Sequence, residues 1–208
     1  WARYRHSMSR RTRKFNDDGE VTDDQTRVYA VEPYRGVPYA KLISKNGDPV
    51  AGDDLAAEKK RWKEFLEALD NPPGEDDEAD DNEIVFNEEL IARFVFALEP
   101  GESLRHRSSL VVSFQPRPGK LPIRRRIDHA LNKARGRVWI DRKTYEAARV
   151  EFELIDKVRL WWGVVGTIAR ARGSLDRGPV VEDMWARLQL ETYTDVRVLF
   201  SRTRRAEM

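Results

Sequence analysis

Apolar and charged residues alternate along several stretches of this chain, and this alternation limits the possible folds more than any other feature. Between residues 148 and 154 the alternate apolar positions are Ala148, Val150, Phe152 and Leu154. A second stretch repeats the pattern with Met184, Ala186, Leu188 and Leu190. Because successive side chains of a strand point to opposite faces, a period of two predicts strands with one apolar and one charged face. A single antiparallel sheet with one wet face accommodates such strands.

Turn sequences indicate further strands. Asn16-Asp17-Asp18-Gly19 is typical of a hairpin turn, and it predicts that residues 2–15 and 21–32 pair as two long polar strands. A third strand, 37–44, follows the break at Pro33 and Gly36 and is closed by a second turn. The remaining predicted strands are 109–115, 137–141, 148–154, 184–191 and 197–205.

Three stretches have the spacing of amphipathic helices. The first begins at Asp53 or Asp54 and places on one stripe the apolar residues Leu55, Trp62, Phe65, Leu66 and Leu69. The second is capped by Asn87 and ends before Pro100, and its predicted buried face consists of Leu90, Ile91, Phe94, Val95 and Leu98. The third covers residues 123–134, with Gly136 as its expected C-cap.

Together these elements predict an α+β, mainly antiparallel β fold in a single domain that spans residues 1–208. The helical stripes must be buried, and the apolar face of the sheet is the only predicted surface large enough to bury them. An acidic run between the first two helices has little to bury. We therefore expect residues 72–83 to form a mobile, solvated loop.

Charge is distributed unevenly along the chain. Residues 1–104 carry 15 Lys and Arg against 24 Asp and Glu, whereas residues 105–208 carry 23 against 12. The simplest interpretation is that the two halves neutralise each other within one fold. The alternative is a basic nucleic-acid-binding surface in the C-terminal half. Its candidate residues are Arg124, Arg125, Arg126, Arg197, Arg202, Arg204 and Arg205.

The sequence lacks the residue patterns of the common catalytic and metal sites. It has no cysteine, which excludes disulfides, thiolate nucleophiles and Cys-based zinc sites. None of His6, His106 and His129 has a partner at metal-ligand spacing. The acidic run lacks the glycine and the spacing of a calcium loop, and there is no Gly-rich phosphate loop. We therefore expect a protein that is not an enzyme and that has no cofactor or metal.

Two adjacent tryptophans, Trp161 and Trp162, would point to opposite faces of a strand. In one interpretation, one packs in the core and a loop covers the other. In the other, both lie at the mouth of an apolar cavity or at a membrane interface, where Trp is favoured. No apolar run approaches the ~20 residues of a membrane-spanning helix. The chain begins at Trp1 rather than Met, so we expect that a signal peptide has been removed.

Four stretches together resemble a known family. They are Val28-Tyr29-Ala30-Val31-Glu32-Pro33; Pro38-Tyr39-Ala40-Lys41-Leu42-Ile43 with Asn46-Gly47-Asp48-Pro49; Phe114-Gln115-Pro116-Arg117-Pro118; and Gly136-Arg137-Val138-Trp139-Ile140-Asp141 with Thr144-Tyr145. In this order, over most of the chain, they resemble the LolA/LolB-like superfamily of outer-membrane lipoprotein carriers and lipoprotein-sorting proteins.

The resemblance implies a curved, incomplete β-barrel that holds lipids or the acyl chains of lipoproteins on its concave face, with about three short helices as a lid. It also implies that the protein is located in the periplasm or at the outer membrane of the bacterial cell envelope. An envelope protein is then a possible partner, and peripheral contact with the membrane is possible. No nucleic-acid partner is expected. The residues predicted to line the apolar cavity are Phe65, Phe94, Leu98, Val150, Phe152, Leu154, Trp161, Trp162, Leu188 and Leu190.

Two further functions stay open. A structural or protein-interaction module of the envelope would show the same alternation but would have a filled interior, whereas a carrier needs an apolar cavity of several hundred Å³. A nucleic-acid binder would use the arginines of the C-terminal half, and its affinity would fall steeply with added salt.

Overall fold

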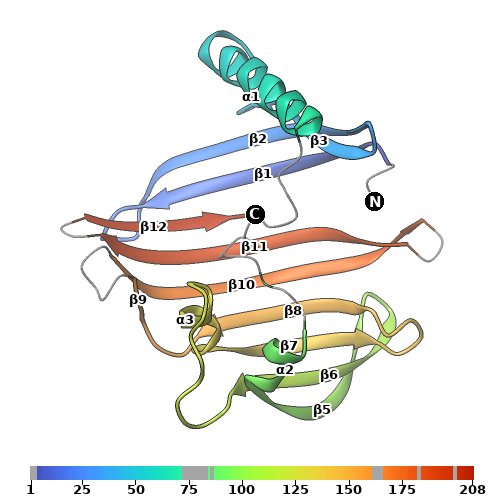
Figure 1. Ribbon diagram of the computed structural model, residues 1–208, viewed down its shortest axis with the longest axis vertical. Coiled ribbons are helices and arrows are strands. Elements are labelled where there is room, and N and C mark those ends of the chain that lie inside the picture. The colour runs from blue at the N-terminus through green and yellow to red at the C-terminus, as the bar shows by residue number, and fades with distance from the viewer. Residues whose placement is uncertain (1–3, 72–83, 85–86, 161–165, 182–183, 199–200) are drawn as a thin grey trace.

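The computed structural model describes residues 4–71, 84, 87–160, 166–181, 184–198 and 201–208. Its strands form one large antiparallel sheet that stays open, so that the fold predicted from the alternation is confirmed (Figure 1). The strand order is β4-β3-β2-β1-β12-β11-β10-β8-β7-β6-β5, and β9 pairs with β10. The strands are β1 (His6–Phe15), β2 (Val21–Tyr34), β3 (Val37–Lys45), β4 (Asp48–Pro49), β5 (Phe94–Leu104), β6 (Arg107–Pro116), β7 (Ala134–Asp141), β8 (Ala147–Leu154), β9 (Val158–Leu160), β10 (Gly166–Val181), β11 (Met184–Val198) and β12 (Ser201–Glu207).

The N-terminal hairpin forms as predicted. The N–H of Gly19 donates to the carbonyl of Asn16 at 3.2 Å, and Gly19 has the positive φ of 87° that such a turn requires. From this turn β1 and β2 pair along their length, with His6 opposite Val31 at the far end. The acidic run at 72–83 and the tryptophans at 161 and 162 lie outside the described residues, so the expectations for them stay untested.

Two of the three predicted helices are shorter than expected. α1 (Gly52–Asp70) matches its prediction, but α2 (Glu88–Ala92) ends before Phe94, and α3 (Asp128–Leu131) occupies only part of 123–134. Asn87 does cap α2, since its side chain accepts the N–H of Leu90 at 2.9 Å. The placement of Phe94 and Leu98 on a helix was therefore wrong.

The ladder with β6 explains why the helix stops. Residues 94–98 are apolar at every position, so they fit a helical stripe and a strand equally well. In the structure they pair with β6, with Phe94 opposite Pro116 and Leu98 opposite Val112. The strand gains a hydrogen-bonded neighbour, and tertiary pairing decides the local structure. Gly136, expected as a helix C-cap, lies within β7 for the same reason.

The helices pack near the two ends of the sheet and leave its middle uncovered in the described structure (Figure 1). The aromatic rings of Trp62 and Phe65 on α1 lie 4.7 and 4.8 Å from that of Tyr39 on β3. At the other end, α2 and α3 complete a small core of Leu90, Phe94 and Leu131. The chain exposes 14779 Å², against about 10,000 Å² for a compact monomer of its mass. The open sheet therefore presents an unusually large surface.

Buried aspartates, each held by arginine, connect the strands. Asp141 is almost fully buried and accepts two hydrogen bonds from Arg107, at 2.6 and 2.9 Å. In the same way, Arg149 donates two hydrogen bonds to the carboxylate of Asp176, and Arg202 donates two to that of Asp195. In each case the side-chain hydrogen bond from arginine lowers the pKa of the carboxyl group below its usual value. These carboxylates stay ionised because their arginines compensate for burial.

We predict that this arrangement makes the fold sensitive to acid. Because the pKa of Asp141 is lowered by folding, its contribution to stability is present above the unfolded pKa of about 4 and is lost as the pH falls below it. Asp141→Asn should reduce the free energy of unfolding near pH 7 by about 2 kcal/mol, and the loss should shrink in acid. Urea unfolding at a series of pH values measures this, and a loss that is independent of pH would contradict it.

Candidate ligand-binding groove

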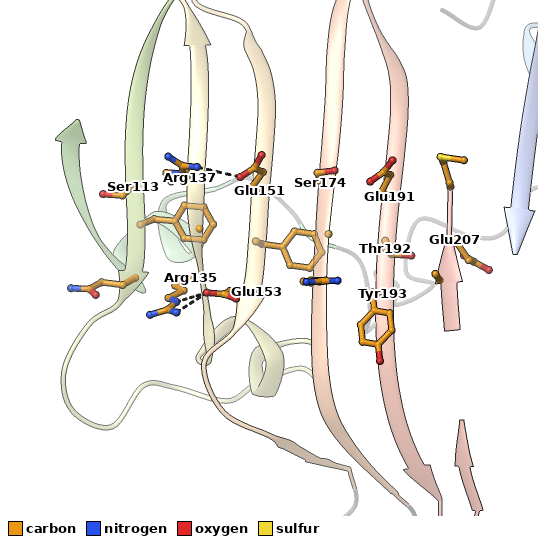
Figure 2. Close-up of a pocket in the computed structure, with 18 of the residues that line it drawn as sticks. Ser113, Arg135, Arg137, Glu151, Glu153, Ser174, Glu191, Thr192, Tyr193 and Glu207 are labelled. Carbon is orange, nitrogen blue, oxygen red and sulfur yellow. Dashed lines mark hydrogen bonds and ion pairs between the residues drawn. The ribbon is translucent and has the colours of Figure 1, made fainter. Parts of the chain in front are cut away.

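A groove of about 960 Å³ crosses the middle of the sheet (Figure 2). It is lined by residues of eight strands, β1, β5, β6, β7, β8, β10, β11 and β12. Its volume lies at the upper end of the range of ~300–1,000 Å³ that is usual for small-molecule sites. The groove is therefore large enough for an elongated ligand.

The groove lies on the polar face of the sheet. The registers of the strands align two rows of lining side chains, Ala97-Ser113-Arg137-Glu151-Ser174-Glu191 and Arg135-Glu153-Arg172-Tyr193, and the pair Val95-Gln115 lies on the same face. Residues opposite each other in a ladder share a face, and positions two apart along a strand share it too. Both rows therefore project on the same side, and the labelled members of the two rows flank the centre of Figure 2.

Between these rows the floor passes over a row of alternating aromatic residues and glycines, whose side-chain positions lie on the opposite, apolar face, where Phe114 packs against Phe94. Phe114 on β6 is paired with Gly136 on β7, Gly136 with Phe152 on β8, and Phe152 with Gly173 on β10. A Cβ atom at Gly136 would lie 2.7 Å from Cζ of Phe114, and one at Gly173 would lie 2.7 Å from Cζ of Phe152. Each phenyl ring thus occupies the space that a side chain on the next strand would need, and only glycine permits this packing.

Most charges that line the groove are neutralised in pairs. Arg135 contacts Glu153 at 2.7 Å, and Arg137 contacts Glu151 at 3.5 Å. Arg11 forms two hydrogen bonds with Asp24, and these lower the pKa of Asp24. The methylene stems of paired arginines can cover apolar groups while their guanidinium groups stay solvated.

Arg172 differs from these arginines. Its guanidinium lies over the ring of Tyr193, 5.4 Å from the ring centroid, and no carboxylate of the described residues lies within ion-pair distance of it. It is exposed and lines the groove. A planar guanidinium without an acidic partner can bind a carboxylate or phosphate of a ligand through paired hydrogen bonds.

The strand registers place Leu98, Val150, Phe152, Leu154 and Leu190, five of the predicted cavity residues, on one face of the sheet, opposite the charged side chains that line the groove. Among the described ones, Phe152 alone lines the groove. Val150, Leu98 and Leu190 belong to an apolar row on the opposite face. Phe65 packs on α1 against Tyr39, and Phe94 lies in the small core under α2 and α3. Leu154 is half-buried, Leu188 is exposed, and neither reaches the groove.

Sequence reasoning missed Gly136, Gly173 and Arg172. A glycine inside a predicted strand can mark a close approach between chains, and Gly136 follows a strongly apolar helix pattern that concealed this signal. Nothing in the sequence distinguishes Arg172 from its neighbour Arg170, because its role depends on the pairing of β10 with β11.

The arginines considered for nucleic-acid binding are largely engaged. Arg202 contacts Asp195 at 2.5 Å, Arg204 contacts the same carboxylate at 3.6 Å, and Arg205 pairs with Glu207. Arg124 lies 3.5 Å from Glu89, which belongs to the acidic half of the chain. These contacts favour internal neutralisation over a basic binding surface.

Within the described part of the chain, no group of three or more His, Asp or Glu side chains is arranged to hold a metal ion. A search of the same residues finds no helix with the length and apolar character needed to cross a membrane.

Comparisons with known proteins gave distant matches only. No family model matches the chain, and no curated protein matches it. A solved outer membrane lipoprotein-sorting protein domain from Vibrio parahaemolyticus is 12% identical, with 97% of this chain and 81% of that chain covered and a TM-score of 0.34. A LolA superfamily protein from Nitrosomonas europaea is 7% identical, with coverages of 100% and 84% and a TM-score of 0.29.

The MucA/MucB complex of Pseudomonas aeruginosa also matches, with 10% identity, coverages of 99% and 88% and a TM-score of 0.25. The first two matches carry the names of the superfamily that the sequence resembles. Every one of these TM-scores is below 0.5.

We predict that Gly136 is essential to the floor of the groove. A Cβ atom there would lie 1.9 Å from the carbonyl oxygen of Glu151, so Gly136→Ala must shift the backbone of β7 or β8. The expected loss is about 1–3 kcal/mol of unfolding free energy, measured with urea. Ser174→Ala, a small change on a neighbouring strand, should stay within about 0.5 kcal/mol. Equal effects of the two substitutions would show that the floor is not tightly packed.

Proposed function

We propose that the protein is a non-enzymatic binding protein of the bacterial cell envelope that carries lipids or the acyl chains of lipoproteins in the groove. The observation that carries the proposal is the groove itself, which spans eight strands and contains Arg172, for which no carboxylate of the described residues lies within ion-pair distance. The location in the periplasm or at the outer membrane is part of the proposal and rests on the resemblance of the sequence.

The shape of the groove suits a long, thin ligand. Phe15, Val95 and Ala97 give the groove apolar surface, and its floor includes the backbone at Phe114 and Phe152. Each methylene of a bound chain that leaves water contributes roughly 0.8 kcal/mol, so partial burial of an acyl chain supports measurable binding. The neutralised pairs Arg135–Glu153 and Arg137–Glu151 impose little net charge on such a chain.

Arg172 would bind the anionic end of the ligand. A carboxylate or phosphate would receive charge-assisted hydrogen bonds from its guanidinium, which Tyr193 holds in place. Arg13 also lines the groove and is half-buried. The proposed ligand is therefore amphipathic, with its headgroup near β10 and β11 and its chain along the floor.

We predict saturable binding of a fatty acid that carries a fluorescent dansyl group at the end of its chain. Ser174→Trp projects a large ring into the groove and should abolish binding. Arg172→Ala should weaken binding about tenfold, which corresponds to ~1.4 kcal/mol. Arg170→Ala, on the same strand but outside the groove lining, should leave the affinity unchanged. Circular dichroism checks that each variant is folded.

The same titration can contradict the proposal in two ways. A folded wild type without saturable binding excludes the groove as a lipid site. Equal affinities of Ser174→Trp and the wild type would place the probe elsewhere, for instance on the opposite face. Mass spectrometry of lipid extracted from the purified protein would then identify any ligand that the protein retains from the cell.

A second candidate function, a protein-interaction module of the envelope, is favoured by the opposite face of the sheet. There the ladder aligns one apolar side chain from each of six strands, Leu98-Val112-Val138-Val150-Leu175-Leu190. Leu98 is 72% exposed and Leu190 is 39% exposed. Contiguous apolar surface of this kind usually marks an interaction site.

We expect this apolar row to make the protein associate. In sedimentation velocity the wild type should form larger species as its concentration rises, whereas Leu98→Lys combined with Leu190→Lys should remain monomeric. Both positions are exposed, so the substitutions should cost little stability. A wild type that stays monomeric at all concentrations would remove self-association as the role of this face.

A further inference from the structure

Arg172 lies opposite a carboxylate that another arginine already binds. In the ladder between β8 and β10 its partner is Glu153. The carboxylate of Glu153 instead contacts Arg135 on β7, at 2.7 Å, on the other side of β8. The guanidinium of Arg172 lies over the ring of Tyr193 on β11, 5.4 Å from the ring centroid (Figure 2). The positive charge of Arg172 is therefore not compensated by an ion pair within the described residues.

Arg13 repeats this arrangement on the other side of the groove. Its ladder partner on β2 is Asp24. Asp24 accepts two hydrogen bonds from Arg11, at 2.9 and 2.6 Å, and these lower the pKa of Asp24. No carboxylate of the described residues lies within ion-pair distance of Arg13, which is half-buried and lines the groove. The groove therefore contains two arginines whose nearest carboxylates are already bound by other arginines.

The two arginines belong to one row across the sheet. The ladder pairs Arg172 with Tyr193, Tyr193 with Ala206 on β12, and Ala206 with Arg13. Residues opposite each other share a face, so both arginines project on the side of the groove. Their Cα atoms are three strands apart, which is about 14 Å at the usual strand spacing. Ala206 places only a methyl group between them, so two long side chains can approach one ligand group above it. We call Arg13, Arg172, Tyr193 and Ala206 the arginine cradle.

The neighbouring charges confine an anion to the arginine cradle. Glu191, two residues before Tyr193 on β11, also lines the groove, and its carboxylate accepts a hydrogen bond from Gln189 at 2.8 Å. This negative charge repels an anion placed farther along the strand in that direction. Two residues after Tyr193, Asp195 is buried and accepts two hydrogen bonds from Arg202. An anion is therefore bound most favourably between the two guanidinium groups of the cradle.

We propose that the arginine cradle binds the dianionic phosphate monoester of a lipid headgroup. The proposal rests on the groove as the lipid site and names the class of its ligand. A phosphate monoester has three acceptor oxygens and carries two negative charges above its second pKa of about 6. Arg172 and Arg13 donate charge-assisted hydrogen bonds to it from opposite sides. A carboxylate or a phosphodiester carries a single charge, so it neutralises one arginine and leaves the other without a partner.

The test titrates the full chain with three ligands at pH 8 by isothermal titration calorimetry. They are a short-chain phosphatidic acid, the phosphatidylglycerol with the same chains, and glycerol 3-phosphate, which has the phosphate monoester but no acyl chain. Phosphatidic acid should bind at least tenfold more tightly than phosphatidylglycerol, and equal affinities overturn the proposal. Glycerol 3-phosphate should bind at least a hundredfold more weakly than phosphatidic acid, because it buries no methylene groups. Equal affinities of these two would show that the site takes a free phosphate ester and not a lipid.

A variant separates the arginine cradle from a general attraction between charges. Arg13→Ala should reduce the preference for phosphatidic acid over phosphatidylglycerol from at least tenfold to below about threefold. Arg10→Ala removes the same charge from the opposite face of β1 and should leave this preference unchanged. An unchanged preference in Arg13→Ala overturns the proposal. If circular dichroism shows that Arg13→Ala is unfolded, the comparison of the two lipids in the wild type still decides the outcome.

The fatty acid titration distinguishes a failure of this proposal from a failure of the proposed function. If the fatty acid binds and the two phospholipids bind with equal affinity, only the assignment of the headgroup is overturned. If the fatty acid and both phospholipids fail to bind, the groove is not a lipid site and both proposals are overturned. Binding of phosphatidic acid alone would support the arginine cradle and exclude fatty acids as ligands.

Discussion

The register between β7, β8 and β10 determines most of what this molecule presents to a ligand. It places Gly136, Phe152 and Gly173 in one row, so that each ring finds a glycine beside it. The same register aligns Arg135 with Glu153 and Arg137 with Glu151 on the other face. A shift of one residue would turn every side chain of a strand to the opposite face. Each charged residue of a shifted strand would then lie beside an apolar residue of its neighbour. The two charged rows that line the groove would no longer align.

Ion pairs between neighbouring strands help to hold this register. The apolar core is divided into small clusters at separate places, such as the one formed by Leu90, Phe94 and Leu131. Asp176 on β10 forms ion pairs with Arg149 on β8 and with Arg105 in the loop between β5 and β6. A carboxylate bound by two arginines, one from a strand and one from a loop, specifies position more sharply than contacts between apolar side chains, because its hydrogen bonds are directional. The high charge content of the chain is thus part of how an open sheet keeps its shape.

The sequence was sufficient to predict most of the strands, but it did not predict which residues line the groove. Strict alternation in residues 148–154 leaves only one reasonable structure, and β8 occupies almost the same range. Residues 94–98 carry no such alternation, and only the presence of β6 decides that they form a strand. The predicted cavity assumed that the helices cover the apolar face. In the structure they lie near the ends of the sheet, and the hollow forms on the charged face.

The position of the hollow on the charged face depends on which strands pair with each other. A sequence reports the period of a strand, but the curvature and coverage of a sheet depend on which strands become neighbours. β12 joins β1 to β11 across almost the whole length of the chain, and no local pattern predicts this pairing.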